Sequence, residues 1–341
     1  MADIEIGFGR RNLDFDEHWE GLDIKRYVVD RPIVLCLGGN GVIDKAKATR
    51  FCGTAERFVG LKKGSDYSSY NEIDLLGFIY TPKPNQPTIG EFNDQQRALI
   101  EDNIFMKLCV DEKGNPLPIE KVVKNFSLIN VFTHCWGARE ISMIGLNVER
   151  KMIKLGYSAQ DIQQAFNQIF HVTYAPYTDH TCFPCLRVNS FVDSVHRELK
   201  EYYKRIFQDS LSGVSLQFDP PGYFRKSKNA MLKVPILSIY SSQLINVESN
   251  SNLRTLIDEH AVDLLERNFD WTQGHQSLNA KNADLVSKMA SYAMAKAIAL
   301  SIRNARTNVL LPKNNLEDLK EELESFKQDY SQEDLNPSID F

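Results

Sequence analysis

The chain has 341 residues, 43% of them hydrophobic and 25% charged, with a formal net charge of -5, and this composition is typical of a globular protein with a large apolar core. Residues 316–341 hold nine acidic side chains and two lysines, so the remainder is nearly neutral, which argues against nucleic-acid binding. Six cysteines are too few for a disulfide framework, and the absence of an N-terminal signal and of any long apolar run predicts a cytoplasmic protein with no transmembrane segment.

Strand and helix patterns alternate along the first part of the chain. Residues 2–8 and 23–29 have the pattern of short strands, and residues 31–37 form a stronger apolar run that ends in the sequence GGNG. The pattern then predicts, in order, a helix at 46–59, a strand at 74–80, a Pro-rich loop at 81–87 and a helix at 94–108.

The central stretch, residues 126–140, has the sequence FSLINVFTHCWGARE. The run 126–132 has the length and β-branched content of a buried parallel strand, and apolar residues recur at helical spacing from Ala138 onward. Cys135 is therefore expected in the turn between a strand and a helix.

The second half continues the alternation. Ser158 and Asp161 have capping-box spacing and predict a helix start, and further elements are predicted as a strand at 170–175, a charged helix at 190–207, a strand at 234–240 and a helix at 283–302. Apolar strands separated by helices indicate an α/β fold with a doubly wound, mostly parallel sheet flanked by helices.

The predicted domain organisation is a single α/β domain over residues 1–310, followed by an acidic C-terminal extension. Residues 180–235, which include a stretch rich in Gly, Pro and Ser, are expected to form a cap or insertion. Residues 311–341 are expected to form an acidic amphipathic helix and a flexible tail, because apolar residues lie at helical spacing over 316–326 only.

The pentapeptide from Thr133 to Gly137 has the form small-x-nucleophile-x-small. It resembles the nucleophile elbow of the α/β-hydrolase superfamily, with Cys135 in the position of the usual serine. The resemblance implies an α/β-hydrolase-like fold and hydrolysis of an ester, thioester or amide. It also implies an oxyanion hole made by backbone N–H groups of Gly39 or Asn40 and of Trp136.

The same resemblance implies a Cys-His-Asp type triad, in the chain order nucleophile, acid, histidine. His275 lies just before the final predicted helix and is a better candidate than His260, which lies in a helix-like charged run. The loop after residues 234–240 has no Asp at the expected distance, so Asp179 is the first choice for the acid and Glu248 the second.

The alternative function is that of a catalytically degenerate hydrolase fold that binds a host or regulatory protein. The off-pattern Thr133, the cysteine in the serine position and the missing acid after Tyr240 favour this reading. In the enzyme hypothesis the ligand is instead a small-molecule, acyl or peptidyl substrate. Fold alone does not decide between the two, because one scaffold hosts many functions.

No cofactor or metal is predicted. The GGNG sequence matches neither common nucleotide-binding glycine motif. His180, Cys182 and Cys185 have the spacing of three zinc ligands, but no second pair accompanies them, so packed thiols in a Pro-containing loop are favoured.

The acidic C-terminus resembles the translocation signal of effectors exported by the Dot/Icm type IV secretion system. This resemblance implies delivery into a host cell without a Sec signal. A solvated helical tail is the alternative interpretation.

Overall fold

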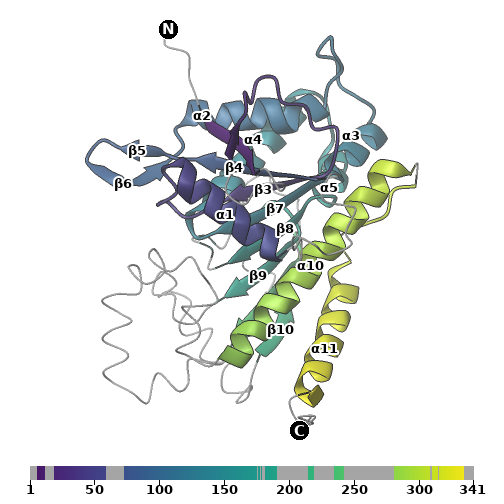
Figure 1. Ribbon diagram of the computed structural model, residues 1–341. Coiled ribbons are helices and arrows are strands. Elements are labelled where there is room, and N and C mark those ends of the chain that lie inside the picture. Colours follow the sequence, from purple (N-terminus) through teal and green to yellow (C-terminus); the bar gives the residue numbers. More distant parts are fainter. Residues whose placement is uncertain are drawn as a thin grey trace.

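The computed structural model describes residues 6–11, 19–58, 73–174, 176, 178, 181–189, 214–218, 234–241, 280–307, 309–313 and 315–333. These residues form a mixed sheet of nine strands with helices on both faces (Figure 1). The predicted α/β class and the mostly parallel sheet are therefore confirmed.

The strands of the main sheet are, in chain order, β1 (Gly7–Arg11), β2 (Trp19–Gly21), β3 (Ile33–Leu37), β4 (Asp74–Ile79), β7 (Ile129–His134), β8 (Phe170–Tyr174), β9 (Cys185–Asn189), β10 (Val214–Phe218) and β11 (Ile236–Ser241). Their order in space is β10-β11-β9-β8-β7-β3-β4-β1-β2. The strands from β11 to β4 pair in parallel, and antiparallel pairs close both edges. The carboxyl ends of β3, β4, β7 and β8 therefore meet at one edge of the sheet, where doubly wound folds place their sites.

The helices cover the two faces separately (Figure 1). One face packs against α2 (Asp94–Ile100), α3 (Ile119–Phe126), α4 (Trp136–Lys154) and α5 (Ala159–Phe166); the other packs against α1 (Lys45–Phe58), α10 (Ala280–Arg306) and α11 (Leu316–Glu333). Along β7, Ile129 and Val131 join the first core and Phe132 the second, as the two-residue period of a strand requires. No helix in the described part of the chain is long and apolar enough to cross a membrane.

The predicted helices at 46–59 and 283–302 and the predicted strand at 74–80 lie within a few residues of α1, α10 and β4. Two shorter predicted segments, at 23–29 and 81–87, have a different structure. Residues 23–29 form a turn instead of a strand, because the N–H groups of Arg26 and Tyr27 both donate to the Asp23 carbonyl. Residues 81–87 are not a loop: they belong to a hairpin of β5 (Thr81–Lys83) and β6 (Gln86–Glu91).

The apolar run 126–132 is shared between two elements. Phe126 ends α3, and β7 begins only at Ile129. Only Ser127 and Leu128 separate α3 from β7. The last buried residue of the helix and the apolar strand therefore look like one continuous apolar run in the sequence. The strand prediction was therefore right in kind but about three residues early.

The interval 180–235 contributes two strands to the main sheet. β9 pairs with β8 and β11, and β10 forms an edge of the sheet. These two segments are thus part of the sheet and not of a cap. The rest of that interval, including the predicted helix at 190–207, lies outside the described residues.

The acidic C-terminal segment forms a helix that packs on the sheet's second core. Leu316, Leu319 and Leu323 are buried there, and Glu322 accepts hydrogen bonds from Lys296 and Tyr292 of α10. The helix continues to Glu333, beyond the predicted 316–326. The resemblance of this segment to a translocation signal stays a prediction.

A buried lysine fastens the connection between α10 and α11 to the start of β7. The Lys313 ammonium donates to the carbonyl of Ile129 at 2.8 Å, to Asn130 Oδ1 at 3.2 Å and to Ser301 Oγ at 3.0 Å. Burial lowers the pKa of Lys313 well below its ordinary value. The C-terminal helices are therefore tied to the strand that leads into Cys135.

We predict that Leu323→Ala lowers the free energy of unfolding by about 2–5 kcal/mol, because it removes a fully buried side chain and leaves a cavity. Urea denaturation followed by circular dichroism measures the change. The matched variant Glu321→Ala, on the exposed side of the same helix, should stay within about 0.5 kcal/mol of the parent. Equal effects of the two substitutions would contradict the packing of α11.

Candidate functional site

Cys135 alone forms the turn from β7 into α4. Its backbone angles are φ 48° and ψ -114°, and it is the only non-glycine residue with positive φ in the described part of the chain. Such a conformation costs an L-residue about 1–3 kcal/mol. The turn is held at both ends, because the Cys135 N–H donates to the Tyr174 carbonyl at 3.0 Å and the Cys135 carbonyl accepts from Ala138 N–H at 3.2 Å.

Gly137 lets the start of α4 approach the end of β3. A Cβ atom added at this position would overlap the carbonyl oxygen of Leu37. A side chain is therefore excluded there, which is the steric reason for a glycine two residues after Cys135.

Thr133 fills the other small position of the pentapeptide, and its side chain is buried. Thr133 Oγ1 lies 2.8 Å from His171 Nε2 and donates to Thr173 Oγ1 at 2.8 Å. These contacts account for a threonine where the hydrolase pattern has glycine.

The sequence GGNG, residues 38–41, forms a loop directly after β3, which we call the glycine loop. This loop lies beside Cys135. A Cβ atom at Gly39 would be 3.8 Å from the Cβ atom of Cys135. Carbonyl groups of the loop accept hydrogen bonds from the structure behind it: Gly38 from the Tyr80 hydroxyl at 2.9 Å, and Asn40 from Gly90 N–H at 2.7 Å. Among the described residues, no acceptor contacts the N–H groups of Gly39 and Asn40. The loop therefore presents donors at the same sheet edge as Cys135.

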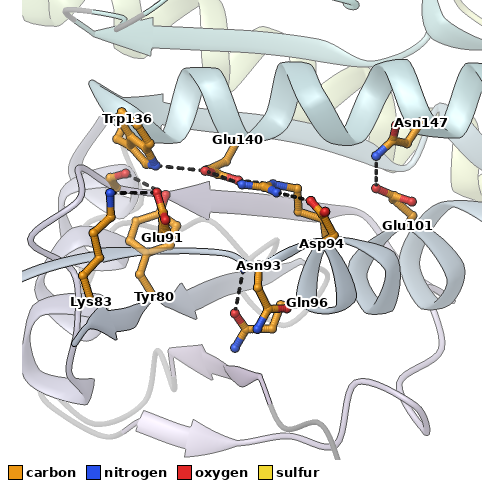
Figure 2. A network of polar contacts seen from close by, with 12 residues as sticks. Tyr80, Lys83, Glu91, Asn93, Asp94, Gln96, Glu101, Trp136, Glu140 and Asn147 are labelled. Atoms are coloured by element: carbon orange, nitrogen blue, oxygen red, sulfur yellow. Dashed lines mark hydrogen bonds and ion pairs between the residues drawn. The ribbon is translucent and has the colours of Figure 1, made fainter. Parts of the chain in front are cut away.

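A buried ionic network fixes the first turns of α4 (Figure 2). Glu140 is fully buried and accepts from Trp136 Nε1 at 2.9 Å and from Arg97 Nε at 2.7 Å. Arg97 belongs to α2 and also donates to Asp94 at 2.8 Å. Further along α4, Asn147 donates to Glu101 at 2.8 Å. The helix that begins at the elbow is thus bound to α2 by charged groups as well as by packing.

The indole of Trp136 also lies against two cations. The Arg139 guanidinium is 4.2 Å from its ring centroid and the Lys83 ammonium 5.9 Å. Lys83 comes from the β5–β6 hairpin and pairs with Glu91 at 3.0 Å. The side chain of Trp136 is therefore fixed from α4 and from the hairpin.

Two histidines near the elbow are buried and neutral. Burial lowers the pKa of His134 to about 4, and burial together with the charge of Arg187 lowers the pKa of His171 to about 3. Groups with such low pKa values are weak bases at neutral pH. The assignment of His275 as the general base stays a prediction.

Of the predicted site residues, the structure brings Gly39 next to Cys135, and Asn40 and Trp136 are their neighbours in the chain. His275, Asp179 and the second-choice acid Glu248 lie outside the described residues, so those assignments stay predictions. Sequence reasoning missed Tyr80 and the pair of Arg97 and Glu140, because they are far apart in the chain and belong to no motif; the only signal was a tyrosine at the end of an apolar strand.

The thiols differ in accessibility. Cys135 is partly exposed, and the five other cysteines are buried. In the described ranges, no group of three or more potential metal ligands occurs. Cys182 contacts the carbonyl of Ser142 at 3.5 Å, and His180 is not among the described residues. Cys135 is thus the cysteine most open to reagents.

No protein-family model matches the sequence, and no curated protein matches it. The function therefore has to be inferred from the geometry around Cys135.

We predict that Cys135→Gly is about 1 kcal/mol more stable than Cys135→Ala, because glycine adopts the observed backbone angles without strain. Chemical denaturation of the two variants measures the difference. In ordinary helices the order is reversed, and Ala138→Gly in the first turn of α4 should cost about 0.5–1 kcal/mol. If Cys135→Gly were less stable than Cys135→Ala, the strained turn would be refuted.

We also predict that Arg97→Met lowers the free energy of unfolding by about 3–5 kcal/mol, because it leaves the buried Glu140 carboxylate without its counterion. The double variant Arg97→Met/Glu140→Met should recover most of the loss, since no charge then stays buried. Urea denaturation of the parent, single and double variants tests this. A double variant no more stable than the single one would contradict the expected coupling.

Proposed function

We propose that this protein is an α/β-hydrolase-like acyl hydrolase in which Cys135 attacks the carbonyl carbon of an ester, thioester or amide. The observation that carries the proposal is the strained conformation of Cys135 in a one-residue turn between strand and helix. Strained residues of this kind cluster at active sites, where they hold a reactive group in an exposed position.

The surroundings of Cys135 favour a nucleophilic thiolate. The thiol lies at the N-terminus of α4, a helix of 19 residues whose dipole stabilises negative charge there. Partial exposure gives a reagent access to the sulfur. Both features support the role of attacking group.

The adjacent backbone donors support acyl chemistry in particular. Attack on a carbonyl places negative charge on its oxygen, and fixed N–H groups are the usual means of stabilising that charge. In the proposal, the N–H of Trp136 and the N–H of Gly39 or Asn40 fill this role. The position of the glycine loop after β3, next to β7 in the sheet, supports the assignment.

The remaining triad roles are carried over from the sequence. His275 takes the proton from the thiol and returns it to the leaving group, and Asp179 orients His275. An imidazolium–thiolate pair also functions with an orienting group that is not a carboxylate. The acid therefore matters less to the proposal than the histidine.

We predict that an acylating probe with an electrophilic carbonyl, such as an activated ester, labels Cys135 and that labelling disappears in Cys135→Ala. Peptide mapping by mass spectrometry identifies the labelled residue. His275→Ala should slow labelling by about 10²-fold or more, because the general base is lost.

Cys182→Ser is the matched control, because it also removes a thiol but leaves Cys135 unchanged, and its labelling should equal that of the parent. Undiminished labelling in Cys135→Ala would overturn the assignment. Complete lack of labelling in the folded parent would favour the alternative, a hydrolase-like fold that serves as a binding module.

A further inference from the structure

The hydroxyl of Tyr80 is fully buried and donates to the carbonyl of Gly38 at 2.9 Å. Tyr80 directly follows β4, and Gly38 directly follows the neighbouring β3. We infer that Tyr80 is a positioning residue, whose hydroxyl turns the Gly38–Gly39 peptide so that the Gly39 N–H faces the reacting carbonyl at Cys135. This inference rests on the proposed function.

The planarity of the peptide group links the two ends of this contact. In a trans peptide the C=O and N–H bonds point in opposite directions, and no described bond is cis. Because the Gly38 carbonyl is directed at Tyr80, the Gly39 N–H is directed away from it. Gly39 itself lies next to Cys135, as a Cβ atom on it would be 3.8 Å from Cys135 Cβ.

The next peptides of the loop are fixed from the same side. The Asn40 carbonyl accepts from Gly90 N–H at 2.7 Å, and the Val42 carbonyl accepts from Tyr80 N–H at 2.9 Å. Tyr80 therefore contributes both its backbone and its side chain. A Cβ atom on Gly90 would lie 2.6 Å from Tyr80 Cβ, so glycine lets β6 come close enough to complete the arrangement.

The carbonyl oxygens at positions 38, 40 and 42 thus all accept from the β4–β6 side. The N–H groups of Gly39 and Asn40 have no acceptor in the part of the chain that the structure describes. A loop whose carbonyls are satisfied on one side and whose N–H donors are left over is preorganised to hold an anionic oxygen.

Tyr80 also stays a donor over the working pH range. Burial, followed by the negative charges of Glu140 and Cys135, raises the pKa of Tyr80 well above its ordinary value. The hydroxyl therefore keeps its proton even when the Cys135 thiolate forms. A deprotonated tyrosine would repel the Gly38 carbonyl and release the loop.

Tyr80→Phe removes this hydroxyl and changes nothing else in the side chain. Two reagents then separate oxyanion stabilisation from simple thiol reactivity. With p-nitrophenyl acetate, the Cys135 sulfur bonds to the acetyl carbon through a tetrahedral oxyanion and p-nitrophenolate leaves; with iodoacetamide, the sulfur displaces iodide and no oxyanion forms. The first-turnover rate at Cys135 is measured for each reagent, with peptide mapping to confirm the site.

We expect Tyr80→Phe to slow acetylation of Cys135 by about tenfold and to leave alkylation within about twofold of the parent. The effect should be smaller than the ~10²–10³-fold loss that follows removal of an oxyanion donor itself. The matched control is Tyr157→Phe, which removes another tyrosine hydroxyl that donates to carbonyls, those of Cys109 and Leu117, at 2.8 Å and 2.7 Å. Its ratio of acetylation to alkylation should equal that of the parent.

Equal rates of acetylation in Tyr80→Phe and the parent would overturn the inference, and so would an equal slowing of both reactions, which would mark Tyr80 as structural only. Failure of the parent to be acetylated at Cys135 is a separate outcome. It would overturn the proposed function, and the positioning role with it, before any variant is compared.

Discussion

The close approach of α4 to the end of β3 is the constraint on which the site depends. Gly137 touches the Leu37 carbonyl with no space for a side chain, so the helix must begin almost at the tip of β7. One residue is left to reverse the chain, and that residue is Cys135. The same approach sets the glycine loop, which begins one residue after Leu37, beside the thiol. The contact between Gly137 and the Leu37 carbonyl therefore goes with both features of the site, the one-residue turn at Cys135 and the glycine loop beside it.

The strain of the elbow is small compared with the interactions that maintain it. A cost of about 1–3 kcal/mol at Cys135 is set against the packing of a long helix and the buried pair of Arg97 and Glu140. Apolar residues of similar volume often replace such an ion pair without loss of stability, whereas removal of one partner alone leaves a buried charge unpaired and is strongly destabilising. In this structure the pair joins α2 to the first turns of α4, and Glu140 also accepts a hydrogen bond from the indole of Trp136.

The sequence predicts the central elements well because they are long, apolar and bounded by turn residues. β3, β4 and α4 are examples, and Ser158 correctly marks a helix start. It does not predict β9, which follows a Pro-containing loop and includes the buried Arg187, nor the division of the run 126–132 between α3 and β7. Cys135, Gly39 and Trp136 belong to local sequence patterns, so they can be nominated from the sequence; the contacts of Tyr80 and Arg97 join residues far apart in the chain, and only folding creates them.

The backbone strain at Cys135 has an evolutionary consequence. A cysteine codon becomes a glycine codon by a single-base change, and glycine relieves the strain at this turn. A lineage that no longer used the thiol would therefore drift easily toward glycine, since proteins accept stabilising substitutions wherever function does not oppose them. A side chain at position 135 is thus the costly state, and among homologues the residue at this turn would distinguish lineages that use the thiol from lineages that do not.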